Sequence, residues 1–128
     1  MNIEVGIDII EIERIRDVIE RLGDKFLKRI FTEHEITTCK SRSAKMMQCF
    51  AARFAAKEAF MKSVGLGMNG LNFKMIEVQN LESGKPLLKL YGKAAEVVKG
   101  KIVKVSLSHT ENYAVAIVIV YENSLKNL

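Results

Sequence analysis

The sequence lacks most features of a membrane, secreted or multidomain protein. Its single proline, Pro86, and the absence of repeats or low-complexity segments leave no obvious linker, so we expect one domain over 1–128. The longest strongly apolar run, 113–121, is too short to cross a bilayer, which takes about 20 residues. The first ten residues carry acids and no basic stretch. We therefore expect no signal peptide and no membrane partner.

Cysteine is scarce as well. Cys39 and Cys49 are the only two, and their spacing matches no common metal-binding motif. In a chain without a secretion signal, two such residues favour a reducing environment. We therefore expect two buried or half-buried thiols in a cytoplasmic protein.

The chain carries a formal net charge of +5. This excess favours an anionic partner, which would be nucleic acid, a phosphorylated small molecule or an acidic protein. The sequence has no helix-turn-helix glycine turn, zinc knuckle or aromatic RNA-binding signature. We therefore expect no nucleic acid partner, since a nucleic-acid-binding module would rest on the charge alone.

Hydrophobic periodicity predicts an α+β fold with helices early and strands late. A strand over 2–9 would have Ile3, Val5 and Ile7 on one side. The other predicted elements are helices over 12–22 and 24–31, a helix beginning at a capping box of Thr32 and Glu35, a long helix over about 44–64, strands near 73–79 and 87–91, a short helix over 92–99, and a hairpin of strands 102–108 and 112–121. This pattern indicates an antiparallel sheet packed against a long helix and several shorter ones.

Asp8 is the first candidate site residue, at the end of the first predicted strand. Two interpretations are open. With Glu11 it could form a capping box for the next helix. Alternatively, a carboxylate held rigidly at a strand end could bind a hard cation.

The long helix contains the stretch FAARFAAKEAFMKSVG, 50–65, and gives a second group of candidates. Glu58 and Lys62 lie one turn apart, either as an exposed ion pair or as the polar margin of an apolar stripe. Arg53 lies on a different side of the helix, where it would serve a different pocket. Gly65 ends the helix, and the glycine-rich loop after it would let backbone amides approach a phosphate.

A third group lies where a predicted strand turns, in SLSHTENYA at 106–114. Ser108 and His109 could occupy a plain surface turn, or they could contact phosphate or ribose. The three groups together supply two carboxylates, a lysine, a glycine-rich loop and a serine–histidine turn. Metal-assisted chemistry on a phosphate ester requires this combination.

The sequence also resembles a known family. The blocks GIDIIEIERI (6–15), FAARFAAKEAFMKSVG (50–65) and SLSHTENYAVA (106–116) are similar to the signature blocks of the holo-acyl-carrier-protein synthases, which are small bacterial 4'-phosphopantetheinyl transferases. The segments 26–35 and 83–96 resemble the same family, so the likeness covers nearly the whole chain. One departure is Leu66 of GLG, where the family commonly has threonine.

The resemblance implies a reaction and an assembly. Coenzyme A would donate its phosphopantetheine to a serine of apo-acyl-carrier protein, releasing adenosine 3',5'-bisphosphate, for fatty acid biosynthesis. Asp8 and Glu58 would hold Mg²⁺ together with the diphosphate of coenzyme A, and Lys62 would contact the same phosphates. Glu58 or a metal-bound water would take up the serine proton. The sites would lie between the subunits of a homotrimer.

The resemblance also implies which residues bind the two substrates. The residues expected at the nucleotide are Lys45, Arg53, Gly65, Pro86, Ser108 and His109. The residues expected to dock the acidic carrier protein are Arg14, Arg21, Lys25 and Lys28, although a merely solvated basic face is the alternative. A non-catalytic trimeric nucleotide-binding or scaffold protein of the same fold is the competing function.

Overall fold

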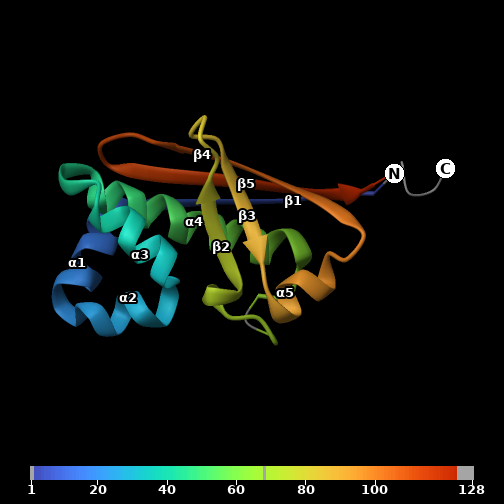
Figure 1. The fold of residues 1–128 in the computed structure, drawn as a ribbon, viewed down its shortest axis with the longest axis horizontal. Coiled ribbons are helices and arrows are strands. Elements are labelled where there is room, and N and C mark those ends of the chain that lie inside the picture. The colour runs from blue at the N-terminus through green and yellow to red at the C-terminus, as the bar shows by residue number, and fades with distance from the viewer. Residues whose placement is uncertain (1, 68, 124–128) are drawn as a thin grey trace.

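The core of the molecule is one long helix with a three-stranded sheet laid along it (Figure 1). The computed structural model describes residues 2–67 and 69–123. The helix is α4 (Met46–Val64), and the strands are β1 (Ile3–Glu11), β4 (Lys101–His109) and β5 (Tyr113–Glu122). They are antiparallel in the order β1-β5-β4. The predicted α+β class, with an antiparallel sheet on a long helix, is confirmed.

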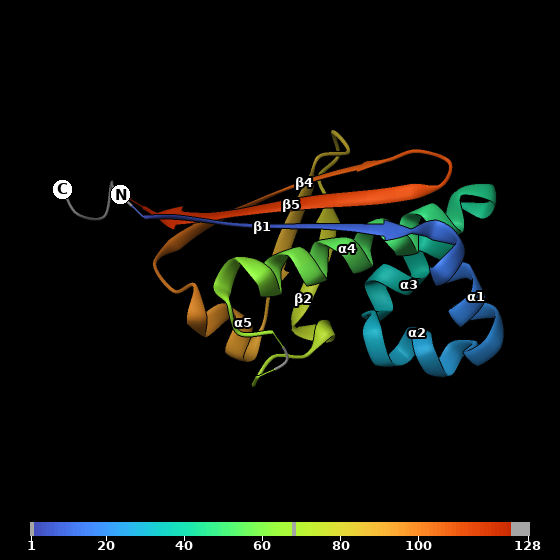
Figure 2. The ribbon, with the colours of Figure 1, turned by 180° about the vertical axis from the view of Figure 1, so that it is seen from behind.

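Shorter elements surround this core. Helices α1, α2 and α3 gather at one end of α4, and α5 lies near its other end (Figure 2). The shorter elements are α1 (Ile12–Leu22), α2 (Asp24–Ile30), α3 (Glu33–Lys40), α5 (Gly92–Val97), the 3₁₀ turns η1 (Ser43–Lys45) and η2 (Phe73–Met75), and the separate antiparallel pair β2 (Ile76–Asn80) and β3 (Pro86–Leu90). Among the helices of the described residues, none is long and apolar enough to cross a bilayer.

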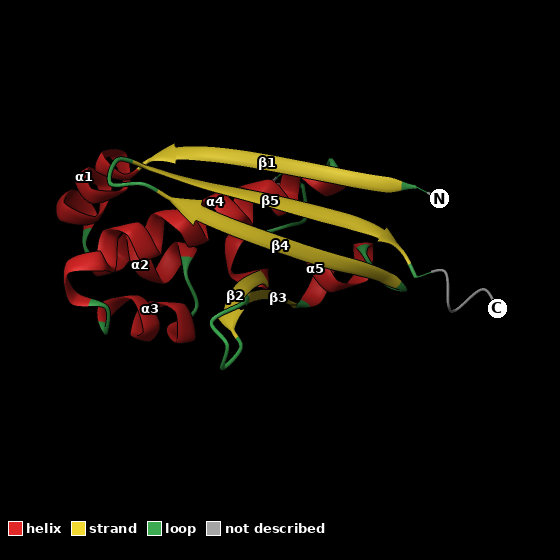
Figure 3. Ribbon diagram, turned by 90° about the horizontal axis from the view of Figure 1, so that it is seen from above, coloured by secondary structure: helices red, strands yellow, loops and turns green. Residues whose placement is uncertain are grey.

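The two faces of the three-stranded sheet differ. The inner face packs on α4 through small and branched side chains of β5, namely Ala114, Ala116, Val118 and Val120. Figure 3 shows the helices beneath the sheet and its other face open. On that open face, Ile3, Val5, Ile7 and Ile9 of β1 are 57–65% exposed. The predicted alternation of β1 is therefore present, with its apolar side directed away from α4.

Gly6 sets the distance between β1 and α4. A Cβ atom built on Gly6 would lie 1.9 Å from the carbonyl oxygen of Ala59 and 2.7 Å from the amide nitrogen of Ser63. Only a residue without a side chain fits there. The strand backbone therefore rests directly on the helix backbone.

A buried ion pair joins α4 to its other neighbours. Lys57 Nζ lies 2.7 Å from Glu35 Oε1, with both side chains fully buried, and it also donates to the carbonyls of Phe73 and Ile76. Glu35 Oε2 accepts from the amide of Val78 at 2.8 Å. Burial lowers the pKa of Lys57, and the Glu35 carboxylate opposes this shift. This network ties α3, α4 and β2 together.

The predicted capping box at the start of α3 is confirmed. Thr32 accepts from the amide of Glu35, and the Glu35 carboxylate accepts from the amide of Thr32. The suggested capping box of Asp8 and Glu11 is wrong. Strand β1 continues to Glu11, whose side chain caps nothing, and the amide of Ile12 donates to the carbonyl of Asn112 instead. Asp8 therefore lies within the strand, where its neighbours on α4 decide its role.

The expectation of two free thiols is also wrong. Cys39 and Cys49 form a disulfide, with their Cα atoms 5.4 Å apart. The physical reason is the tight turn between α3 and α4, which brings the last turn of one helix against the first turn of the next. Both residues are buried beside Phe50. Their separation of ten residues along the chain gave no sign of this contact.

Because the backbone of β1 rests directly on α4 at Gly6, replacing Gly6 with Ala should destabilise the fold strongly. We expect a loss of about 3 kcal/mol or more in the free energy of unfolding, because the added methyl group forces β1 off α4. Gly65→Ala is the matched control, since Gly65 is in the left-handed conformation with φ 72° but has open space around it and should lose only about 1–2 kcal/mol. Urea denaturation measures both, and equal losses would contradict a steric role for Gly6.

Candidate active site

A cluster of charged groups lies where β1 crosses α4. Asp8 follows Gly6 by two residues, so its side chain is on the same, inner side of the strand. Glu58 directly precedes Ala59, the residue under Gly6. Lys62 lies one turn further along and donates to Asp8 Oδ1 at 3.1 Å and to the carbonyl of Ile7 at 3.0 Å. The fold thus brings together two acids that are 50 positions apart in the chain.

Burial and the neighbouring charges shift the pKa of Glu58. Burial raises the pKa of Glu58, the neighbouring Asp8 carboxylate raises it further, and Lys62 opposes both. Glu58 and Lys62 do not form the plain surface ion pair that was one interpretation of the sequence, because Lys62 bonds to Asp8. A second positive charge near Glu58 would relieve the repulsion between the carboxylates.

The two carboxylates open into a cavity of about 320 Å³. Its other lining side chains include Arg14, Phe54 and Tyr113. Arg14, expected at the carrier-protein surface, therefore also borders the acidic cluster. Tyr113 was not predicted, although it lies within the candidate stretch SLSHTENYA.

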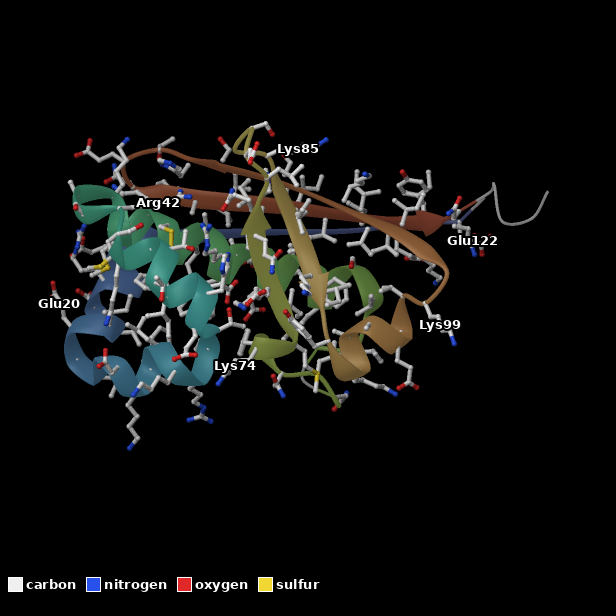
Figure 4. The ribbon with its side chains drawn as sticks, in the orientation of Figure 1. Glu20, Arg42, Lys74, Lys85, Lys99 and Glu122 are labelled. Atoms are coloured by element: carbon white, nitrogen blue, oxygen red, sulfur yellow. A yellow bond between two sulfur atoms is a disulfide. The ribbon has the colours of Figure 1, made fainter. Side chains whose placement is uncertain are left out.

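A second cavity, of about 230 Å³, holds most of the residues expected at a nucleotide. Lys45, Arg53, Pro86 and His109 all line it. Arg42, which was not predicted, lines it too, and Figure 4 shows Arg42 at the end of the molecule where α3 and α4 meet. No acidic residue of the described chain lines this cavity. The cavity is therefore suited to an anion.

Arg53 is the buried cation of this second cavity. It is only 2% exposed, and its NH2 group donates to Asn80 Oδ1 at 2.7 Å. Arg53 Nε and Gln48 Oε1 are buried without a hydrogen-bond partner among the described residues. Burial and the nearby Arg42 lower the pKa of Arg53 to about 10, so it remains charged at neutral pH. A buried cation with spare donor capacity fits a ligand that brings oxygen acceptors.

The remaining predicted residues lie elsewhere. Gly65 ends α4 in the left-handed conformation, with φ 72°, and borders a third cavity together with Lys62. Ser108 lies on β4 opposite Val115 and does not line the cavity of Arg53. The other expected docking residues, Arg21 on α1 and Lys25 and Lys28 on α2, are exposed. The structure therefore separates the predicted residues into a carboxylate cavity, a basic cavity and a basic surface.

The carboxylate cavity and the basic cavity open at opposite edges of the sheet. Asp8 belongs to β1, which forms one edge, and His109 ends β4, which forms the other. Arg53 and Glu58 are five residues apart on α4, which places them about 140° apart around the helix. The sequence-based expectation that these two residues serve different pockets agrees with this arrangement.

Three residues with polar side chains that line the basic cavity were missed. Arg42 directly precedes η1, Gln48 lies in the first turn of α4, and Asn80 ends β2. The positive charge of Arg42 was a signal, because it lies three residues before Lys45. Asn80 and Gln48 carried no signal, since a single amide side chain has no characteristic pattern in sequence.

Comparison with known proteins identifies the family. Residues 4–118 match the model of the 4'-phosphopantetheinyl transferase superfamily. The chain is 48% identical over 123 residues to the holo-[acyl-carrier-protein] synthase of Koribacter versatilis, covering 93% of this chain and 98% of that one. It is 42% identical over 118 residues to the enzyme of the same name from Halothermothrix orenii, covering 90% and 94%.

Solved structures agree. The holo-(acyl-carrier-protein) synthase of Bacillus anthracis in complex with CoA (3',5'-ADP) superposes with a TM-score of 0.78 at 39% identity, covering 94% of this chain and 96% of that one. The Helicobacter pylori enzyme in complex with coenzyme A gives 0.81 at 32%, covering 91% and 98%. The chain therefore belongs to the 4'-phosphopantetheinyl transferase superfamily and, within it, to the family of the holo-[acyl-carrier-protein] synthases.

Proposed function

We propose that this protein transfers the 4'-phosphopantetheine group of coenzyme A to a serine of apo-acyl-carrier protein and releases adenosine 3',5'-bisphosphate. The observation that carries the proposal is the meeting of Asp8, Glu58 and Lys62 where β1 crosses α4, in a chain of this family. In the reaction, the serine oxygen forms a bond to the phosphorus next to pantetheine. The bond from that phosphorus to the bridging oxygen of the diphosphate breaks, the bisphosphate leaves with the electron pair of that bond, and the serine proton passes to Glu58 or to water.

We propose Mg²⁺ as the cofactor, held by Asp8 and Glu58. The donor set fits, because Mg²⁺ is usually bound by one or two carboxylates with phosphate oxygens and waters rather than by an all-protein cage. The described residues contain no cluster of three or more metal-binding His, Cys, Asp or Glu side chains. When bound, the ion would neutralise negative charge on the diphosphate.

Lys62 supplies a second positive charge. Its ammonium group is paired with Asp8 at 3.1 Å, but its side chain is 55% exposed. An exposed pair of this kind contributes at most about 1 kcal/mol. Lys62 can therefore exchange part of its contact for a phosphate oxygen and stabilise the charge that grows on the leaving bisphosphate.

We place the nucleotide end of coenzyme A in the basic cavity of Lys45, Arg53, Pro86 and His109. Its cations support an anionic ligand, as does a lining without acidic side chains among residues 2–67 and 69–123. The carboxylate cavity and the basic cavity open at opposite sheet edges, so one coenzyme A molecule would draw its contacts from two copies of the chain. A site between subunits follows from this placement.

We propose a homotrimer, the assembly that the family resemblance implies. The open face of the sheet supports association of copies, because its β1 side chains are apolar and mostly exposed. Val115, Ile117 and Ile119 of β5 lie in register beside Ile9, Ile7 and Val5 and extend this apolar face. Monomeric proteins rarely expose an apolar area of this kind.

We propose that the carrier protein docks on α1 and α2. Arg21, Lys25 and Lys28 are exposed there, and Leu22 is 47% exposed among them. An exposed leucine surrounded by cations fits a partner with an acidic rim and an apolar centre. Arg14 extends this surface to the carboxylate cavity.

Removing either carboxylate should abolish most activity. Asp8→Ala and Glu58→Ala should each lower kcat by about 100-fold or more, because each removes a ligand and charge from the reacting diphosphate. The measurement is the intact mass of an apo-acyl-carrier protein incubated with coenzyme A and Mg²⁺, with Glu96→Ala as the exposed carboxylate control. Wild-type rates for either variant at saturating Mg²⁺ would remove the metal-ligand assignment.

Charge reversal on α1 and α2 should weaken carrier-protein binding alone. In the double variant Arg21→Glu with Lys25→Glu, we expect KM for the carrier protein to rise about tenfold while KM for coenzyme A stays unchanged. Lys99→Glu is a control, since Figure 4 shows Lys99 at the opposite end of the molecule from Glu20 of α1. If both KM values rose equally, the docking assignment would be wrong.

Charge on the open face of the sheet should break the assembly. Val5→Lys with Ile7→Lys should convert a trimer into monomers, as measured by light scattering, and should abolish activity because each site is then incomplete. Leu81→Lys, at a residue 50% exposed outside this face, is the control. A wild-type protein that is monomeric and fully active would contradict both the assembly and the shared site.

A further inference from the structure

Asn80 contacts the most buried cation of the basic cavity. It is the last residue of β2, and its Oδ1 accepts from the Arg53 guanidinium at 2.7 Å. This is the one side-chain hydrogen bond found for Arg53 among the described residues, where no carboxylate pairs with it. The orientation of the guanidinium in the cavity therefore depends on one amide.

The hydrogen-bond partner of Arg53, the side chain of Asn80, is an uncharged amide. An amide oxygen orients a guanidinium without adding negative charge, so the full charge of Arg53 stays available to a ligand. An aspartate of the same size would form an ion pair and neutralise it. Asn80 thus holds the arginine in place and leaves its charge free.

The same amide also holds the opposite wall of the cavity. Asn80 Nδ2 donates to the carbonyl of Gly84 at 3.0 Å, and the Asn80 backbone pairs with Pro86 across the hairpin. Gly84 and Pro86 both line the cavity. One side chain therefore connects the cation from α4 to the β2–β3 turn that faces it.

The charge of the cavity suits a ligand with more than one phosphate group. Arg42, Lys45 and Arg53 line it with His109, and no acidic residue of the described chain does. Arg53 is the buried cation of this set. At a buried position the dielectric constant is lower, so the electrostatic interaction with the ligand is stronger and depends more on the charge of the ligand.

We propose that Asn80 is a positioning residue that holds the Arg53 guanidinium toward the cavity and thereby gives the enzyme its preference for a nucleotide with a second phosphate. The inference rests on the proposed placement of the nucleotide in this cavity. It adds the residue that sets the selectivity of that site.

Isothermal titration of the full-length protein tests it, with adenosine 3',5'-bisphosphate and adenosine 5'-monophosphate as probes. The wild type should bind the bisphosphate more tightly. Asn80→Ala should weaken binding of the bisphosphate by about tenfold, because Arg53 loses the hydrogen bond that holds it toward the second phosphate. Binding of the monophosphate, which lacks that phosphate, should stay nearly unchanged. Asn80→Asp, which preserves the size of the side chain, should reduce the preference at least as much because it neutralises Arg53.

Gln79→Ala is the matched control. Gln79 lies next to Asn80 and bonds to Glu77 rather than to Arg53, so its loss tests general damage to β2. It should keep the wild-type ratio of the two affinities. A purely structural role for Asn80 would weaken both nucleotides equally.

The possible results distinguish the role of Asn80 from the placement of the nucleotide in the basic cavity. If the wild type prefers the bisphosphate and both Asn80 variants keep that preference, the role of Asn80 is wrong while the nucleotide site stands. If the wild type binds neither nucleotide, or binds both equally, the placement of the nucleotide is wrong and the role of Asn80 falls with it.

Discussion

The contact between Gly6 of β1 and Ala59 of α4 is the constraint on which the candidate site depends. A side chain at position 6 would overlap the backbone of the helix, so the strand and helix backbones are in direct contact there. Asp8 follows two residues later on the same side of β1, and Glu58 and Lys62 flank Ala59 on α4. The proximity of these three charged residues is therefore a consequence of backbone packing at Gly6.

The helix α4 distributes its charged residues among different neighbours. Arg53 contacts Asn80 of β2, Lys57 pairs with Glu35 of α3, and Lys62 pairs with Asp8 of β1. A buried pair such as that of Lys57 contributes little net stability over an apolar pair, but breaking it leaves a charge in the core. The network therefore favours one arrangement of α3, α4 and β2, and the same arrangement places Arg53 against the β2–β3 hairpin.

The position of the charged groups also bears on the proposed assembly. Because β1 and β4 form opposite edges of one sheet, the carboxylates and the basic cavity open on different sides of one copy. The open apolar face lies between these edges. Association through this face would cover the exposed isoleucines and would also bring the edge of one copy toward the edge of another, so that stability and a complete site would arise from the same contact.

The sequence by itself determined the fold class, the main elements to within a few residues and the capping box at Thr32, because periodicity and caps are local properties of the chain. Its motifs also indicated Asp8, Glu58, Lys62 and Arg53 as candidate site residues. Only the tertiary structure decided that Lys62 pairs with Asp8, that Cys39 and Cys49 are joined, and that Asn80 holds Arg53. Those contacts join residues 10 to 54 positions apart, and periodicity shows which side of an element a residue occupies without showing what covers that side.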